Sequence, residues 1–408
     1  MTEKFIILAL VLLAGIYELV LNIVQMRSAN NPTPENVSDV YDADTYIKWK
    51  KYSAENSRLS IASTVVSTLI SLALLALNVH SSFASLFGGG FFPQLLSVVI
   101  LETVVGTLIS TIFGYIRTMK IEEKYGFNRS SIKTFVFDVV RGLIIGFILS
   151  LALITLLAVI HRGMGDWLII LFAGAVFLIS LAISFLYPIF SRIGNKFVPL
   201  EEGELRDRLM GLLTKHGYKV KAIEVMDASR RTTKLNAYFT GFGKLKTIVL
   251  YDNLVNSMTT DEICAVFSHE LGHGLHKDVL KMQIMNFFNL LIMAVIAWFA
   301  VRTFALHGAF GFEEVNYGFA YVLMSIGLSL TQPLSSLFMN AYSRFAEYRA
   351  DRQAIEEGYG VALVGGLKKL AKENFAHLAP SKVNVVLEYS HPPLSERIEA
   401  IEKELKKD

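Results

Sequence analysis

Seven long apolar segments limit what this chain can fold into more than any other feature of its sequence. Each is close to the roughly 20 residues that a helix needs to cross the hydrocarbon core of a bilayer. The whole chain agrees, because 53% of its 408 residues are hydrophobic and only 18% are charged, a balance that soluble domains rarely reach. The sequence therefore predicts a mainly α-helical integral membrane protein with about seven transmembrane helices, at Phe5–Gln25, Ile61–Val79, Leu95–Ile116, Gly142–Ile160, Trp167–Phe190, Met285–Phe304 and Phe319–Met339.

The distribution of lysine and arginine among the short loops predicts the orientation of these helices, because positively charged loops stay in the cytoplasm. Basic residues gather in residues 26–60 and 117–133, after the first and third spans, whereas His80–Gln94 has none. The N-terminus is then outside, and the long segment after the fifth span and the C-terminus are cytoplasmic. The first span follows Met1-Thr-Glu-Lys and ends without a small-residue cleavage pattern, so we expect a retained span and not a signal peptide.

Net charge and cysteine content argue against several other classes of protein. The net charge of +3 is small and favours neither nucleic acid nor a strongly acidic substrate as a partner. Cys264 is the single cysteine, which excludes an internal disulfide framework. Because zinc thiolate sites usually bring several cysteines at short spacing, we interpret Cys264 as a small buried helix residue.

The segment Ser191–Lys281, between the fifth and sixth spans, has the pattern of a small α/β unit. We predict an amphipathic helix followed by three strands, the last two forming a hairpin through Gly241-Phe242-Gly243. These elements are Glu201–Gly217, Tyr218–Met226, Leu235–Thr240 and Leu245–Tyr251. After the last span the chain becomes soluble again, with helices near Arg344–Glu357, Val361–Asn374 and Ser395–Lys406.

The α/β unit ends in a helix that carries the motif H-E-x-x-H, with His269, Glu270 and His273. Histidines four residues apart lie one above the other on a helix face, so both imidazoles can reach one ion. Zinc accepts imidazole nitrogen, and the adjacent Glu270 is placed to take the proton of a bound water. Thr259 or Thr260 can cap this helix. The alternative is a solvated polar face with two incidental histidines.

A catalytic zinc site needs a third protein ligand, and two residues come into question. His276 is one turn beyond His273 but about 10 Å along the helix axis from His269, so one ion is not expected to bind both. Glu347 is the stronger candidate, and Asp351, four residues on, faces the same way. A carboxylate ligand plus a second carboxylate that holds a histidine N–H suits zinc. The alternative is an ordinary helix face with solvated ion pairs.

Two carboxylates fall inside predicted spans, Glu18 in the first and Glu102 in the third. Each would cost a few kcal/mol if it faced lipid. We therefore expect them to face the protein interior or a water-filled space. The alternative is a local hydrogen-bonded pair that only fixes helix packing.

The whole chain resembles the type I CAAX prenyl proteases, which are membrane zinc metallopeptidases of the gluzincin type. The resemblance rests on the seven spans, on the place of the metal motif between the fifth and sixth of them, and on several short motifs. These are Tyr125-Gly126-Phe127-Asn128, Asn236-Ala237-Tyr238-Phe239, Ile248-Val249-Leu250-Tyr251-Asp252, His269-Glu270-Leu271-Gly272-His273, Ser343-Arg344 through Glu347-Tyr348 to Ala350-Asp351, and Ser390-His391-Pro392-Pro393 with Arg397.

The resemblance implies a fold and a set of roles. The fold is a barrel of seven helices around a large intramembrane chamber, capped by the catalytic domain. The zinc ligands are His269, His273 and Glu347, with Glu270 as general base and Asp351 holding a ligand in place. We divide the chain accordingly into residues 1–190, with spans one to five, 191–281, a zincin-like subdomain, 282–340, with spans six and seven, and 341–408, the helical remainder of the catalytic domain.

Two further roles complete the expected site. The tetrahedral oxyanion needs a donor besides the metal, and His391, with Arg397 nearby, is the candidate; the alternative is a structural cap. Asn236-Ala237-Tyr238 is expected to form an exposed edge strand to which an extended substrate adds, unless it is an ordinary hairpin strand.

The predicted function is hydrolysis of peptide bonds by zinc-activated water, near the C-terminus of prenylated or similar membrane-associated peptides. The predicted cofactor is one Zn²⁺ per chain, and the partners are the peptide substrate and membrane lipid. The alternatives are a quality-control protease for damaged membrane proteins and a non-enzymatic membrane scaffold or transporter. The intact Glu270 argues against the last.

Overall fold

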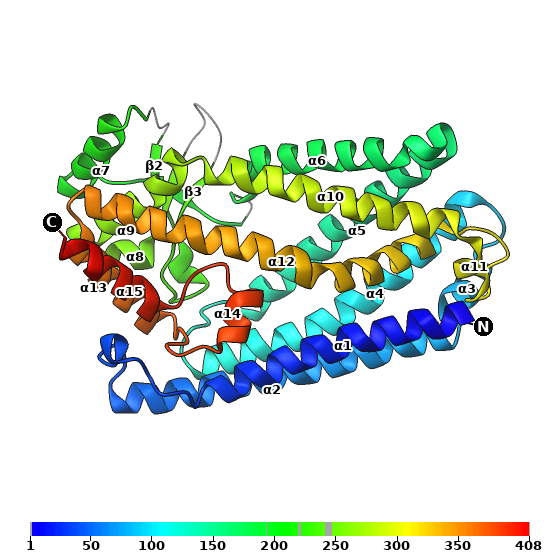
Figure 1. Cartoon of the computed structure of the whole chain (residues 1–408), viewed down its shortest axis with the longest axis horizontal. Helices are drawn as coiled ribbons and strands as arrows, with labels where there is room; N and C mark the ends of the chain where they lie inside the picture. Colours follow the sequence, from blue (N-terminus) through cyan, green and yellow to red (C-terminus); the bar gives the residue numbers. More distant parts are fainter. Residues whose placement is uncertain (1, 193, 219–221, 241–246, 408) are drawn as a thin grey trace.

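The structure, a computed structural model, describes residues 2–192, 194–218, 222–240 and 247–407. Long helices run along the longest axis of the molecule, and a smaller unit with a sheet lies at one end (Figure 1). Although the second, fifth and sixth predicted spans run one to three residues past a helix end, all seven predicted spans coincide with long helices of this bundle. These are α1 Thr2–Ser28, α2 Ala43–Ala76, α4 Phe91–Ile116, α5 Ile132–Met164, α6 Leu168–Phe190, α10 Asp278–Arg302 and α12 Tyr317–Glu356.

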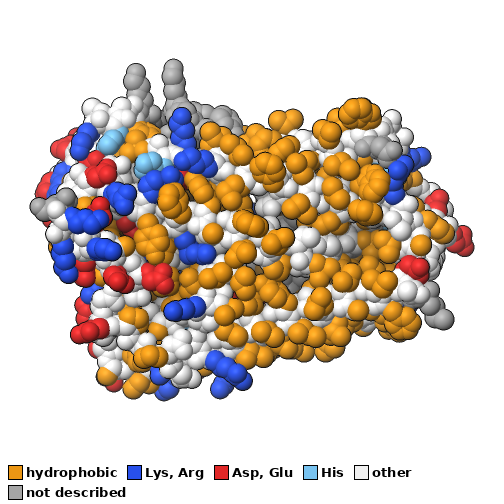
Figure 2. Space-filling view, viewed as in Figure 1, with side chains coloured by type: hydrophobic (Ala, Val, Ile, Leu, Met, Phe, Trp, Pro, Cys, Tyr) orange, Lys and Arg blue, Asp and Glu red, His pale blue; other side chains and the backbone are white. Residues whose placement is uncertain are grey.

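Most of these helices are suited to cross a membrane. Among the described residues, six are long and apolar enough to do so; α6 is apolar over the shorter stretch Leu168–Ser184. Their outer faces carry many exposed large apolar side chains, such as Phe5, Leu108 and Ile148, because lipid replaces water around them. Apolar side chains cover the middle of the molecule in the view of Figure 2, and charged side chains gather at the end that holds the sheet. The prediction of a polytopic membrane protein is confirmed.

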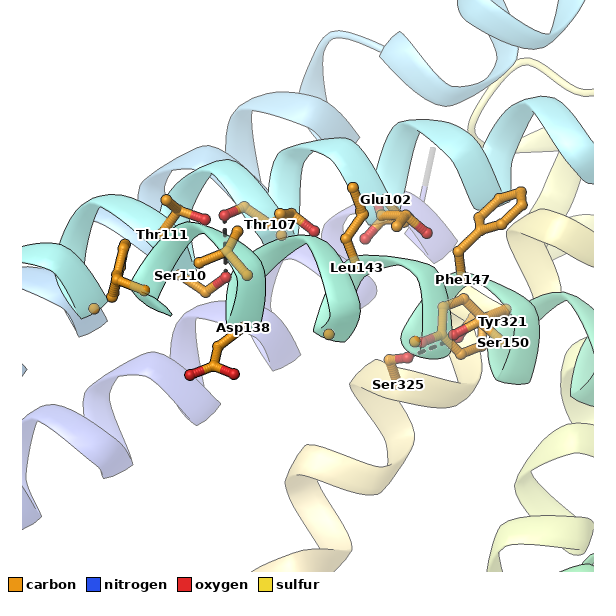
Figure 3. A pocket seen from close by; sticks show the side chains of 17 residues that line it. Glu102, Thr107, Ser110, Thr111, Asp138, Leu143, Phe147, Ser150, Tyr321 and Ser325 are labelled. Atoms are coloured by element: carbon orange, nitrogen blue, oxygen red, sulfur yellow. Dashed lines mark hydrogen bonds between the residues drawn. The ribbon is translucent and has the colours of Figure 1, made fainter. Parts of the chain in front are cut away.

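The helix bundle contains cavities lined by both polar and apolar side chains. A cavity of about 460 Å³ lies among α4, α5 and α12, where Glu102, Ser110, Asp138 and Ser325 surround it (Figure 3). A second cavity of about 400 Å³ lies among α1, α2, α4 and α12 and is lined by Glu18 and again by Glu102. Both carboxylates thus line interior cavities, as expected for charged groups within spans.

Glu102 has a hydrogen-bond partner inside this bundle, and that partner is not Glu18. The Nε2 atom of His80 lies 2.6 Å from a carboxylate oxygen of Glu102, and His80 is buried. His80 belongs to the short helix α3 Val79–Ser85, which follows the second span. The pair therefore joins α3 to α4.

The α/β unit has a four-stranded sheet in the order β1-β2-β4-β3. Its strands are β1 Phe197–Pro199, β2 Ala222–Met226, β3 Ala237–Thr240 and β4 Thr247–Tyr251. β2 is parallel to β4, whereas β1 and β3 pair antiparallel with β2 and β4, respectively. The predicted pairing of the last two strands is confirmed, and its turn at Gly241-Phe242-Gly243 lies outside the described residues. β3 is an edge strand of the sheet.

Two helices of the α/β unit flank the sheet. α7 Glu204–Lys215 buries Leu209, Leu212 and Leu213, as the amphipathic pattern predicts. α9 Thr260–Leu275 carries the H-E-x-x-H motif and begins with a capping box, in which Thr259 and Glu262 satisfy each other's backbone N–H groups. Phe267 and Leu271 are buried against the sheet core, so this face of α9 packs while the other is left for the histidines. Cys264 is buried in the same helix, as predicted.

The last membrane helix departs from the prediction. The expected separate helix near Arg344–Glu357 does not begin anew, because α12 continues without interruption for 40 residues from Tyr317 to Glu356, with Pro333 inside it. It therefore also runs through residue 340, where the predicted division set a boundary. Glu347 lies on the part of α12 that follows the predicted span Phe319–Met339. The remaining helices are α8 Asp252–Ser257, α11 Phe304–Gly308, α13 Gly360–Glu373, α14 Lys382–Glu388 and α15 Leu394–Leu405.

Candidate metal centre

Three side chains from two helices converge where α9 of the α/β unit packs against α12. His269 and His273 come from α9 and Glu347 comes from α12, and one ligand atom of each lies within 4.8 Å of the others. The Nε2 atom of His269 is 3.4 Å from one carboxylate oxygen of Glu347, and that of His273 is 3.3 Å from the other. The structure therefore brings together the three residues that the resemblance implies as ligands.

A glycine allows the two helices to approach this closely. Gly272 lies between the two histidines in sequence, and a Cβ atom built on it would lie 3.0 Å from Ala350 Cα and 3.0 Å from Gln353 Cβ on α12. Ordinary carbon contacts are about 3.5–4.0 Å. A larger residue would push α9 and α12 apart, and with them the imidazoles and Glu347.

Each imidazole is held from behind by a carboxylate. The Nδ1 atom of His269 lies 2.8 Å from Asp351 Oδ1, and the Nδ1 atom of His273 lies 3.0 Å from Asp278 Oδ2. Ionised carboxylates only accept hydrogen bonds, so each Nδ1 carries the proton and donates it. Both Nε2 lone pairs are then free to face Glu347. This arrangement is the usual one around metal-binding histidines.

Asp278 was not singled out by the sequence analysis, although it holds one of the two histidines. It begins α10 directly after Lys277, whose positive φ of 57° turns the chain between α9 and α10. Tyr342 donates a hydrogen bond of 2.8 Å to Asp278, and Arg349 forms an ion pair with it. The sequence contains one indication of this role. Metal-binding histidines almost always donate their other ring N–H to a partner, and Asp278 follows His273 by only five residues.

Arg397 holds the two carboxylates of α12. Its Nε donates to Asp351 Oδ2 at 2.9 Å, and its Nη1 lies 3.2 Å from Glu347 Oε2. Arg397 comes from α15 and is only 8% exposed. The guanidinium therefore binds the C-terminal helix to the metal centre and offsets the burial of two negative charges.

The residues fit a divalent metal such as zinc. Two imidazole nitrogens and a carboxylate are a known catalytic zinc donor set. Glu347 is 3% exposed, and its buried Oε2 atom forms no hydrogen bond although the Arg397 guanidinium lies 3.2 Å away. A buried carboxylate oxygen without a hydrogen bond is costly, and a cation between the three ligand atoms would satisfy it.

A cavity of about 500 Å³ adjoins these ligands. Glu270 lines it, and within the described residues no side chain forms a hydrogen bond with this carboxylate. Burial raises the pKa of Glu270, and the two neighbouring imidazoles oppose that shift. His391 lines the cavity too, with its side chain 65% exposed and its Nε2 atom 3.3 Å from Glu347 Oε1. His276 caps the end of α9 and is not part of the ligand group.

The edge strand β3 opens onto the same cavity. Asn236 and Ala237 line it, and Asn236 accepts a hydrogen bond from the Tyr251 backbone of β4 at 3.1 Å. Tyr238 points elsewhere: its ring packs edge-on against Tyr251, with centroids 6.4 Å apart, and it does not line the cavity. Of the predicted substrate strand, two of the three residues thus border the metal centre.

Comparison with known proteins identifies the family. Residues 199–405 match peptidase family M48, and residues 22–192 match the CAAX prenyl protease N-terminal region of five membrane helices. A CAAX prenyl protease 1 homolog of Oryza sativa subsp. japonica is 30% identical, over 97% of this chain and 96% of that protein. CAAX prenyl protease 1 of Saccharomyces cerevisiae is 27% identical, over 90% of this chain and 88% of that protein.

A solved structure agrees with this assignment. The crystal structure of S. mikatae Ste24p superposes with a TM-score of 0.91 at 26% sequence identity, covering 98% of this chain and 99% of that one. The agreement extends over the helix bundle and the α/β unit together. The chain belongs to peptidase family M48, as a membrane metallopeptidase similar to the CAAX prenyl proteases.

Proposed function

We propose that this chain is a zinc endopeptidase that cleaves prenylated or similar membrane-associated peptides near their C-terminus. The observation that carries the proposal is the convergence of two carboxylate-held imidazoles and the buried Glu347, next to a cavity into which Glu270 projects. Three protein ligands leave a fourth position on zinc open for a water molecule, as hydrolysis requires, whereas a structural zinc site is normally closed by four protein ligands.

Bound zinc would lower the pKa of a water molecule and polarise the scissile carbonyl. In the proposed mechanism Glu270 accepts the proton of the attacking water and then delivers it to the leaving amine. Its lack of any side-chain hydrogen-bond partner among the described residues leaves the carboxylate available for this transfer. We expect Glu270→Gln to abolish peptide cleavage while zinc stays bound, because the amide cannot accept the proton; full retained activity would exclude this role.

His391 is proposed to donate a hydrogen bond to the developing oxyanion. Its imidazole is next to a ligand but exposed to the cavity, which is the position such a donor needs. Arg397 is proposed as a positioning residue, since its hydrogen bonds and ion pairs go to Asp351 and Glu347. Loss of His391 should lower kcat with little change in zinc content, whereas loss of Arg397 should lower both.

The substrate is proposed to bind as an extended strand along β3. Asn236 and Ala237 supply backbone groups at the edge of the sheet beside the metal ligands, and an added strand would place a peptide bond across the cavity. Leucines of α13 line the cavity opposite, Leu363, Leu367 and Leu370 among them. They suit apolar side chains of the substrate.

The need for a prenyl group is the part of the proposal that rests on relatives, whose printed names call them CAAX prenyl proteases. Matched peptides with and without a farnesyl group, cleaved by the purified protein and analysed by mass spectrometry, test it. A strong preference for the farnesylated peptide supports the proposal. Equal cleavage of bare peptides and of unfolded membrane proteins would instead favour a quality-control protease.

The orientation in the membrane is a proposal too. The first residues lie at the end of the bundle opposite the sheet, and the C-terminus lies at the sheet end (Figure 1). We propose that the sheet end is cytoplasmic, because basic residues crowd the loops there. Single cysteines introduced at each end into a Cys264→Ser protein, labelled with an impermeant reagent in intact cells, would report the orientation.

A further inference from the structure

A basic cavity outside the metal centre lies where α5 begins. It has a volume of about 270 Å³ and is lined by Lys133, Thr134 and Phe137 of α5, Gly194 after α6, and Arg230 and Arg231 before β3. Three segments that are far apart in sequence thus meet around one small space. None of these residues lines the cavity of the metal centre.

The position of charged residues along α5 indicates where this cavity lies relative to the bilayer. The helix has 33 residues, or about 50 Å at 1.5 Å per residue, against a hydrocarbon core of roughly 30 Å. Residues 142–160 carry no charge and account for about 30 Å. Arg141 therefore lies at the edge of the hydrocarbon core, and Lys133, eight residues nearer the start of α5, lies about 12 Å further out, from where its long side chain can reach back towards the lipid headgroups.

Helix α6 places the cavity at the same level relative to the bilayer. α6 Leu168–Phe190 has no charged residue and is followed at once by Arg192, so Gly194 lies just outside the hydrocarbon core. On α5, Val136 and Phe137 are about half exposed, at 51% and 50%. At four-residue steps the exposed face of Val136 continues through Val140 and Ile144 into the hydrocarbon core, where it faces acyl chains, so the cavity adjoins the lipid.

The cavity has more positive than negative charge around it. Arg231 forms an ion pair with Asp138, and Arg141 lies 3.9 Å from the same carboxylate. Arg230 contacts Asp227 at 3.0 Å, yet its side chain is 63% exposed. Lys133 is exposed, and no carboxylate of the described residues forms an ion pair with it. The four basic residues thus outnumber the two carboxylates.

Gly194 keeps the floor of this cavity open. Its φ is +84°, and a Cβ atom there would lie 3.2 Å from a guanidinium nitrogen of Arg231 and 3.9 Å from one of Arg141. With no side chain at this position, Arg231 can line the cavity while one of its guanidinium nitrogens donates to the Gly194 carbonyl oxygen at 3.3 Å. Arginine and lysine arranged around a small space are the usual partners of a phosphate group.

We propose that this cavity binds the phosphate headgroup of an anionic phospholipid. Lys133 and Arg230 would supply the main ionic contacts, while the acyl chains would lie along Val140 and Ile144 on the outer face of α5. The bound lipid would join the α5–α6 pair to the segment that leads into the edge strand β3. A phospholipid brings a phosphate ester together with hydrocarbon chains. A soluble phosphate offers only the charged group and not the apolar chains.

Native mass spectrometry of the full-length protein, titrated with dioleoyl phosphatidic acid in detergent, tests the proposal. We expect one saturable lipid adduct whose dissociation constant rises about tenfold or more in the double variant Lys133→Gln/Arg230→Gln. The matched control is Lys51→Gln/Lys120→Gln, which removes the same charge from exposed residues on α2 and beyond α4 at the same end. Unchanged size-exclusion elution and zinc content show that each variant is folded.

Two parallel titrations separate the sources of phosphate. Dioleoyl phosphatidylcholine should bind at least tenfold more weakly than phosphatidic acid, and inorganic phosphate should displace the lipid only at far higher concentration. Equal loss of binding in the control variant would overturn the proposal, because binding would then follow net charge alone. Phosphate that binds as tightly as the lipid would overturn it in favour of a soluble ligand.

Discussion

Replacing Gly272 by alanine tests whether the approach of α9 to α12 sets the metal geometry. The new methyl group would lie 3.0 Å from both Ala350 Cα and Gln353 Cβ. Ala350 Cα is a backbone atom, so relief requires the helices to separate by a few tenths of an ångström. The two histidines move with α9 and Glu347 moves with α12, so the separation acts directly on the distance between ligands.

The magnitude follows from two opposed contributions. Alanine stabilises a helix by roughly 1 kcal/mol relative to glycine, whereas overpacking costs about 1–3 kcal/mol. Together these two effects should lower the free energy of unfolding of Gly272→Ala by up to about 2 kcal/mol. Misplacement of a ligand should lower zinc affinity and peptidase activity by about tenfold or more.

The assay needs a control for helix propensity alone. Gly211→Ala in α7 offers one, because a Cβ there meets nothing within 4 Å. Thermal unfolding, zinc affinity by competition with a chelating dye, and cleavage of a fluorogenic peptide are compared for both variants. Gly211→Ala should be as stable as the parent or more so, with unchanged zinc affinity. A Gly272→Ala protein that gains stability and keeps full zinc affinity would refute the reasoning.

Further predictions concern the groups around the site. Asp278→Ala should lower zinc affinity 10- to 100-fold, because His273 loses the carboxylate that orients it; metal analysis after dialysis measures this. A chelator should abolish cleavage, and zinc should restore it in the parent but not in Glu347→Ala. Burial lowers the pKa of His377 to about 4 from 6.5, so the unfolded chain binds the proton more readily. Stability should therefore be complete above about pH 6.5 and fall towards pH 4, by at most about 3 kcal/mol; thermal unfolding of His377→Gln should lack this part of the pH dependence.

The membrane helices illustrate what local composition can predict. Each of the seven predicted spans coincides with a long helix, and six of these helices are long and apolar enough among the described residues to cross a membrane, because hydrophobicity over about 20 residues is a property of the segment itself. The ends of the helices were not predicted, since α2 and α12 extend well beyond the hydrocarbon core as polar helix. Whether such an extension stays helical depends on what it packs against, and α12 packs against α9, α13 and α15.

In the α/β unit, too, some elements follow from the local sequence and others do not. The helix with the metal motif and its cap were predictable, because periodicity and capping act within a few residues. The short strand β1 was not predicted, since three residues carry too little pattern and gain their order only by pairing with β2.

The sequence by itself determined that two histidines share one helix face with Glu270 beside them, because a spacing of four residues on a helix leaves no other arrangement. It favoured Glu347 over His276 as the candidate third ligand but could not show that this carboxylate reaches the two histidines. The tertiary structure decided that placement, together with the parts of Asp278, Arg397 and Gly272. Each depends on how closely α9, α10, α12 and α15 approach one another, and that approach is set by packing among residues far apart in the chain.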